Sequence, residues 1–199
     1  MTPILEEISA RISDPEAARL LVKYVELLEK WSSRHNLVRF SSRRELLERH
    51  IFEAAEGARH LNPSGRLADI GSGAGLPGIP LLVCQRDWTG VLIEPRQKRW
   101  AFLRLVIREL GLDATVVNSR FEGCANAGNF DCITVRAVKI EEQLLDFAAH
   151  HLEPGGKMML WSTREEFERL SMKKGWHVLS SPLPDLDRGL LIEMEPCFT

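Results

Sequence analysis

The first sixty residues carry apolar side chains every three or four positions, which is the period of an α-helix that buries one face. We expect helix from residue 4 to about residue 31, interrupted once at Asp14-Pro15. Ser41-Ser42 can cap a third helix, which the pattern predicts from about Arg43 to Leu61. The turn cluster Asn62-Pro63-Ser64-Gly65 then marks the expected end of the helical part.

After this turn, short apolar runs alternate with helical stripes. Strands are expected at 66–70, 90–94, 114–118, 131–135 and 157–161, and helices at about 79–86, 96–110, 140–151 and 163–174. Such alternation predicts a parallel sheet covered by helices on both faces. Two last apolar runs, 176–179 and 190–194, predict a closing antiparallel hairpin. We therefore expect an α/β unit over residues 63–199 and a helical extension over residues 1–62, together one compact body.

The composition is that of a soluble globular protein, with 44% hydrophobic and 27% charged residues. No apolar stretch approaches the roughly 20 residues of a membrane span, and no secretory signal is visible, so we expect a cytoplasmic protein. A net charge of −2 excludes a broadly basic surface, so nucleic-acid binding would have to come from local patches.

The cysteines show no C-x-x-C spacing, and we interpret them as buried or half-buried thiols rather than metal ligands or disulfides. They are Cys84, Cys124, Cys132 and Cys197.

The run from Leu67 to Gly78 carries the clearest functional signal. Its first half is typical of a short buried strand, and its second half places four glycines in eight residues, Gly71, Gly73, Gly75 and Gly78. Glycine permits tight turns and a close approach of the backbone to a ligand. A helix is expected directly afterwards, so strand, loop and helix start together predict a cradle for a nucleotide cofactor.

Three residues narrow the choice of cofactor. Leu76 stands where a dinucleotide-binding loop needs its third glycine. Asp69, two residues before Gly71, is instead typical of S-adenosylmethionine-dependent methyltransferases. Glu94 ends the next apolar run, where a carboxylate accepts hydrogen bonds from ribose hydroxyls. Asp69 could alternatively be a loop cap and Glu94 a solvated strand end, but together they predict S-adenosylmethionine and a class I, Rossmann-like methyltransferase fold.

The longer string DIGSGAGLPGIPL resembles the small-subunit (16S) ribosomal RNA methyltransferase G family, also called glucose-inhibited division protein B. Other segments across residues 20 to 160 share the family's patterns. They are Trp31 with His35-Asn36-Leu37, Arg49-His50-Ile51-Phe52-Glu53, Lys98-Arg99 with Phe102-Leu103, Ser119-Arg120-Phe121-Glu122, Thr134-Val135-Arg136-Ala137, and Leu152 to Gly156.

The resemblance implies an enzyme that methylates guanine N7 in the 530 loop of 16S rRNA with S-adenosylmethionine, on RNA or a small-subunit particle, as a monomer. It places cofactor contacts at Gly71, Leu76, Phe121-Glu122 and Arg136, with Glu94 at the ribose. The chain departs from the family at three places. Glu94-Pro95 replaces Asp-Ser, Glu53 replaces Asp, and Leu160-Trp161-Ser162 replaces a Leu-Lys-Gly turn, which removes a cation from a strand end.

Guanine N7 is a neutral lone-pair nucleophile, so the reaction needs no general base and we predict none. Catalysis is expected from holding N7 in line with the methyl–sulfur bond. Arg136 ends the fourth strand, at the edge where such sheets hold ligands, so we expect it to contact the cofactor carboxylate or the guanine. The alternative is a surface ion pair.

Two groups of cations are candidates for phosphate binding. The first lies near the start of the third helix, where Glu45 and Glu48 could instead make it a neutralised, solvated face. The second lies beside Glu94. The candidates are Arg39, Arg43, Arg44 and Arg49, then Arg96, Lys98 and Arg99.

Two other functions remain open at this point. The chain could methylate a small molecule or a protein, or it could be a non-catalytic ribosome-binding protein on the same scaffold.

Overall fold

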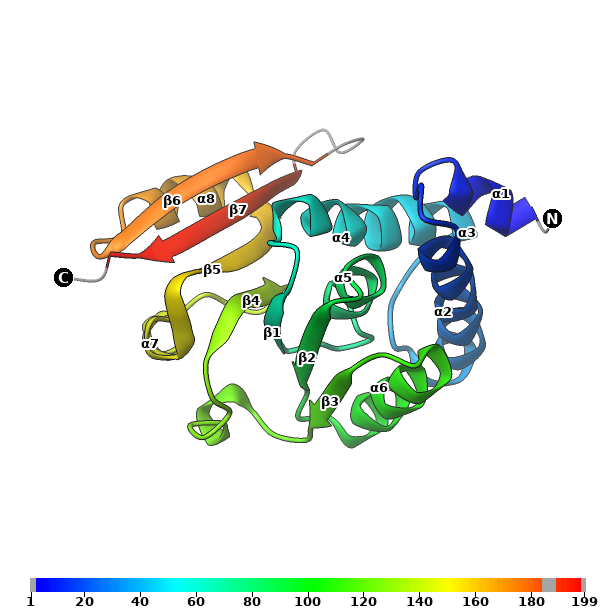
Figure 1. Ribbon diagram of the computed structural model, residues 1–199, viewed down its shortest axis with the longest axis horizontal. Helices are drawn as coiled ribbons and strands as arrows, with labels where there is room; N and C mark the ends of the chain where they lie inside the picture. Colours follow the sequence, from blue (N-terminus) through cyan, green and yellow to red (C-terminus); the bar gives the residue numbers. More distant parts are fainter. Residues whose placement is uncertain (1–2, 184–188, 198–199) are drawn as a thin grey trace.

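The computed structural model describes residues 3–183 and 189–197 (Figure 1). Seven strands form one sheet in the order β3-β2-β1-β4-β5-β7-β6. The strands are β1 (Gly65–Ile70), β2 (Trp88–Ile93), β3 (Ala114–Val117), β4 (Phe130–Arg136), β5 (Leu152–Thr163), β6 (Trp176–Pro182) and β7 (Gly189–Pro196). Strands β1 to β5 are parallel, and β7 is antiparallel to both β5 and β6. The predicted parallel sheet with a closing hairpin is therefore confirmed.

Helices connect the strands and cover both faces of the sheet. Those inside the α/β part are α5 (Gly78–Cys84), α6 (Gln97–Leu110), η3 (Phe121–Gly123), α7 (Glu142–His151) and α8 (Arg164–Ser171). Alternate strand residues enter two cores, because successive side chains point to opposite faces. Leu67 and Leu92 join the core that contains α5 and α6, whereas Ala68 and Ile93 join the core that contains α7 and α8.

The N-terminal helices pack on the α5–α6 face. They begin with α1 (Pro3–Ser9) and α2 (Pro15–His35), which lie at the opposite end of the molecule from the β6–β7 hairpin (Figure 1). The Asp14 side chain accepts a hydrogen bond from the Glu16 N–H and so caps α2, and Asn36 ends it in the left-handed conformation. The ring of Trp31 lies 5.4 Å from that of Phe102 on α6. The helices from 3 to 60 therefore share a core with the sheet.

The helix predicted over 43–61 is confirmed in extent, because helical backbone runs without a break from Arg43 to His60, but its turns are irregular. Four consecutive elements make it up, α3 (Arg43–Leu46), the π-helix η1 (Leu47–Phe52), α4 (Glu53–Glu56) and the 3₁₀-helix η2 (Gly57–His60). A π-turn shifts the face that the following residues present, and such turns are frequent at functional sites. The strand predicted at 157–161 is also longer, because residues 152–156 join it as β5.

The cysteines are free thiols. Cys124 and Cys132 are buried and Cys84 is half-buried, but Cys197 is exposed, contrary to the prediction. It follows Pro196, the last residue of β7. No helix in the described part of the chain is both long and apolar enough to cross a bilayer.

Candidate cofactor site

The carboxyl ends of β1 and β4 define the site. These two strands are neighbours, whereas the chain continues from β1 towards β2 on one side and from β4 towards β5 on the other. Open α/β sheets hold ligands at such a switch in strand order. The glycine loop follows β1 directly, and Arg136 is the last residue of β4. The two sequence motifs therefore meet at this point.

Three glycines give the loop its shape. Gly71, Gly73 and Gly75 have φ angles of 70°, 59° and 97°, in the region that L side chains rarely adopt. A Cβ at Gly71 would lie 2.5 Å from Cγ2 of Val138, so that position has no room for a side chain. A Cβ at Gly73 would meet nothing closer than Nη1 of Arg99 at 3.5 Å, so Gly73 lies on the open side of the loop.

The Glu94 carboxylate is buried beside the loop, with 3% of the residue exposed. One oxygen accepts the Gly73 N–H at 2.8 Å, and the other accepts the Arg96 N–H at 2.8 Å. A carboxylate can accept about four hydrogen bonds, so both oxygens keep acceptor capacity for a ligand. This arrangement excludes the interpretation of Glu94 as a solvated strand end.

A cleft of about 250 Å³ opens next to Glu94. It is lined by apolar side chains and by polar groups at its rim. The lining residues are Ile70, Gly71, Ile93, Pro95, Arg96, Ser119, Arg120, Phe121, Glu122 and Val138. Of the predicted contacts, Gly71, Phe121 and Glu122 lie together here.

The side chains of Asp69 and Leu76 are buried in the protein under the glycine loop. Asp69 is fully buried and accepts a hydrogen bond from the Thr134 hydroxyl at 2.8 Å, while the Ser72 hydroxyl donates to the Asp69 carbonyl at 2.7 Å. Burial raises the pKa of Asp69 to about 6, and the Thr134 hydrogen bond opposes the shift. Leu76 is 9% exposed and belongs to the α5–α6 core. Both residues support the loop from beneath.

Arg136 reaches the helical segment that precedes β1. Its Nη2 donates to the Arg49 carbonyl at 2.7 Å and to Oε2 of Glu53 at 2.8 Å, and it lies 3.5 Å from Nδ1 of His50. Burial raises the pKa of Glu53, and Arg136 opposes this rise. Burial and the Arg136 charge both lower the pKa of His50. Nη1 of Arg136 is buried and has no hydrogen-bond partner within the described residues.

The predicted phosphate-binding cations divide into two groups. Arg43 donates through Nε and Nη2 to the Glu29 carboxylate, both at 2.7 Å, and Arg99 donates to the Leu37 carbonyl at 3.4 Å. The other side chains are solvent-facing and form no ion pair or hydrogen bond with any described residue. They are Arg39, Arg44, Arg49, Arg96 and Lys98.

Two residues at the site were not singled out in the sequence. Tyr24 on α2 is fully buried and donates its hydroxyl to the Ala74 carbonyl at 2.8 Å, so the N-terminal segment braces the glycine loop. It is the chain's one tyrosine and sits within the apolar stripe of α2, which is the signal that could have revealed it. Arg120 lines the cleft and lies within the segment Ser119-Arg120-Phe121-Glu122, but its own role was not predicted. Among the described residues, no cluster of three His, Cys, Asp or Glu side chains could hold a metal ion.

Solved structures with a similar fold include methyltransferases. A precorrin-6y C5,15-methyltransferase from Geobacter metallireducens has a TM-score of 0.59 at 14% identity, over 73% of this chain and 87% of that one. A putative caffeoyl-CoA O-methyltransferase from Staphylococcus aureus also has a TM-score of 0.59 at 14% identity, over 92% of this chain and all of the other. The fold is therefore the class I, Rossmann-like methyltransferase fold.

Sequence comparison gives the family. The profile described as rRNA small subunit methyltransferase G matches residues 17–181. Curated relatives named ribosomal RNA small subunit methyltransferase G include one from Stenotrophomonas maltophilia, 32% identical over 83% of this chain and 78% of its own length. Another from Laribacter hongkongensis is 36% identical over 77% and 73%. The chain is therefore a methyltransferase that belongs to the rRNA small subunit methyltransferase G family.

Proposed function

We propose that this protein transfers the methyl group of S-adenosylmethionine to N7 of a guanine in the 530 loop of 16S rRNA. The observation that carries the proposal is the Glu94 carboxylate, fixed by the Gly73 and Arg96 amides beside a cleft at the switch point of the sheet. Family membership supports the RNA substrate, and the resemblance noted above supplies the guanine and its loop.

The residues present fit this cofactor. Glu94 would accept hydrogen bonds from the two ribose hydroxyls, and the cleft with Phe121 would hold the adenine. The unpaired Nη1 of Arg136 would donate to the cofactor carboxylate or to the substrate guanine. The cofactor supplies an electrophilic methyl group on a sulfonium. No other coenzyme chemistry is needed.

The protein's own contribution is to bind, orient and exclude water. Because N7 attacks through a neutral lone pair, no proton leaves before the methyl group moves, and a general base is unnecessary. Asp69 is the carboxyl nearest the loop with a raised pKa, but it lies beneath the loop and is hydrogen-bonded to Thr134. We therefore assign it to support of the loop, and the rate enhancement to alignment.

Recognition of RNA would use the unpaired cations. Arg96 and Arg120 lie at the cleft itself, and Arg49 lies next to Arg136. A guanine exposes its N7 edge to an enzyme most readily in a loop, where bases are unstacked. Phosphate contacts from these cations would position such a loop over the cleft.

The test is transfer of a labelled methyl group. The protein is incubated with labelled S-adenosylmethionine and, separately, with small-subunit particles and naked 16S rRNA from cells that lack this methylation. We expect label in 16S rRNA, and a lower rate of labelling at limiting S-adenosylmethionine when Glu94→Ala replaces the native protein. Label in ribosomal protein or in a small molecule from cell extract, with none in RNA, would contradict the proposal.

A further inference from the structure

The ion pair of Arg136 with Glu53 joins the end of β4 to the helices before β1. The two side chains are 18% and 9% exposed, so the pair is largely removed from water. Removing one partner of a buried pair leaves the other charge uncompensated, which makes the pair sensitive to substitution. Arg136 has a proposed ligand role, whereas Glu53 has no role in the proposed reaction.

The irregular helix places two acceptors on one nitrogen of Arg136. Arg49 lies in the π-helix η1 and Glu53 begins α4, four residues later, so they share a helix face. The carbonyl of Arg49 and the carboxylate of Glu53 both accept from Nη2. The Glu53 carbonyl in turn accepts the Trp161 Nε1–H at 2.8 Å. This bond anchors the Glu53 backbone to β5 without using its side chain.

A guanidinium is planar and rigid, so fixing Nη2 with two acceptors also sets the position of Nη1. Nη1 is buried and unpaired within the described residues, and a buried donor left without a partner is costly. We infer that Glu53 is a positioning residue, which holds Arg136 so that Nη1 stays available to the carboxylate of the cofactor or to the guanine. The inference rests on the ligand role proposed for Arg136.

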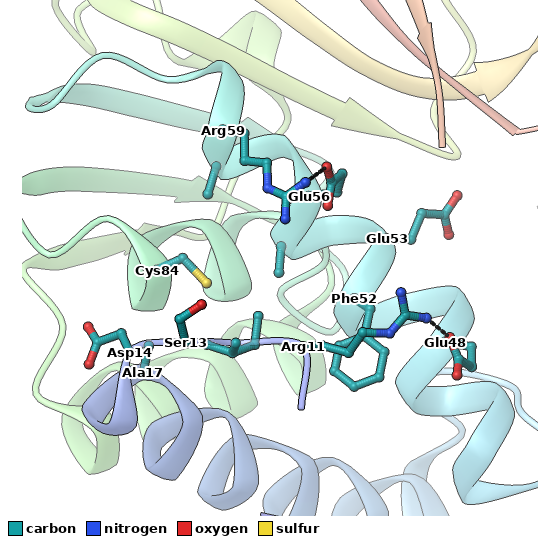
Figure 2. Close-up of a pocket in the computed structure, with 13 residues that line it drawn as sticks. Arg11, Ser13, Asp14, Ala17, Glu48, Phe52, Glu53, Glu56, Arg59 and Cys84 are labelled. Atoms are coloured by element: carbon teal, nitrogen blue, oxygen red, sulfur yellow. Dashed lines mark hydrogen bonds and ion pairs between the residues drawn. The ribbon is translucent and has the colours of Figure 1, made fainter. Parts of the chain in front are cut away.

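The chain offers a matched control one turn later. Glu56 is also a glutamate of α4, but it pairs with Arg59 at 2.7 Å, and both residues line a cavity of about 270 Å³ between the α1–α2 connection and the helical segment from η1 to η2. Figure 2 shows Glu56 turned towards Arg59, whereas the Glu53 carboxylate points away from both ion pairs of that cavity. Glu56→Ala therefore removes a carboxylate from the same helix without touching Arg136.

The experiment measures kcat/KM for methyl transfer and the affinity for S-adenosylhomocysteine. We expect Glu53→Ala to lower kcat/KM by about tenfold to a hundredfold. Glu53→Gln keeps an acceptor for Nη2 and should lose less. Glu56→Ala should match the native protein. In an Arg136→Ala background, Glu53→Ala should change kcat/KM by less than about twofold, because the group it positions is already gone.

If Arg136→Ala has a reduced kcat/KM, two results would overturn the inference. One is a native kcat/KM for Glu53→Ala. The other is a double variant whose fold-loss in kcat/KM equals the product of the fold-losses of the two single variants. If Arg136→Ala itself keeps native kcat/KM, the proposed role of Arg136 fails, and the inference fails with it. Thermal unfolding identifies a misfolded Glu53→Ala protein, in which case Glu53→Gln and its double variant carry the same test.

Discussion

Replacement of Glu94 by alanine is the substitution with the largest expected effect on cofactor binding. It removes the acceptor of the Gly73 N–H and of the Arg96 N–H, two charge-assisted hydrogen bonds of 2.8 Å each. It also removes the proposed acceptor of the ribose hydroxyls. Loss of one to two charge-assisted hydrogen bonds to the ligand corresponds to about 1–3 kcal/mol, or about fivefold to 150-fold in Kd.

The conservative variant separates charge from shape. In Glu94→Gln one carboxylate oxygen becomes an NH₂ group, which would face a backbone N–H of Gly73 or Arg96. Two donors cannot pair, so we expect Glu94→Gln to weaken binding as well. Glu168→Ala is the control, because Glu168 is an exposed glutamate of α8. This helix covers the face of the sheet opposite to α5 and α6.

Calorimetry with S-adenosylhomocysteine measures the effect, and thermal unfolding without ligand measures the cost to the fold. Ligand-induced stabilisation should fall in parallel with affinity, because the ligand binds the folded state only. The reasoning is refuted if Glu94→Ala binds S-adenosylhomocysteine with native affinity. It is also refuted if Glu168→Ala loses as much affinity as Glu94→Ala.

Three further predictions follow from the same geometry. Tyr24→Phe leaves the Ala74 carbonyl without its hydroxyl donor, so it should lower the free energy of unfolding by about 1–3 kcal/mol and weaken S-adenosylhomocysteine binding. An unchanged unfolding free energy together with unchanged affinity would show that this hydrogen bond does not support the loop. Because the pKa of Asp69 is raised from 3.8 to about 6, the folded state binds the proton more tightly, so its stability falls as pH rises between these values, by about 3 kcal/mol. Urea unfolding at pH 4 and pH 7 should show that the free energy of unfolding falls more in the native protein than in Asp69→Asn. An equal change in the two proteins would contradict the prediction. Reversing the unpaired Arg39, Arg44 and Arg49 to glutamate should weaken RNA binding and reduce its log–log salt slope by about 0.7–0.9 per lost contact, with cofactor affinity unchanged; a native slope would remove these residues from the RNA interface.

The parts of the fold that follow from local pattern could be predicted. The strands predicted for the α/β part are short apolar runs bounded by turn residues, and the glycine loop needs backbone angles that few other residues tolerate. The position of Glu94 followed from the same logic, since parallel strands of similar length end at one edge of a sheet. Local pattern therefore gave the sheet, the loop and the acid beside it.

Contacts between residues far apart in the sequence determined the features that the local hydrophobic pattern could not predict. The helix expected over 43–61 has irregular turns where Arg136 and Trp161, far along the chain, bond to Arg49 and Glu53. Arg43 is paired with Glu29 on the neighbouring helix, a partner that local spacing does not indicate. Asp69 follows the family motif but lies beneath the loop, because a side chain at that strand position points to the α5–α6 face.

The most direct test of the proposed reaction is the identity of the methylated nucleoside. Small-subunit particles that lack the modification are treated with the protein and S-adenosylmethionine, and the 16S rRNA is digested and separated by mass. We predict one new 7-methylguanosine per rRNA molecule, located in the 530 loop, and slower formation of it by Glu94→Ala at limiting S-adenosylmethionine. A methyl group on another atom or another nucleoside, or no methylation by a folded native protein, would contradict the account.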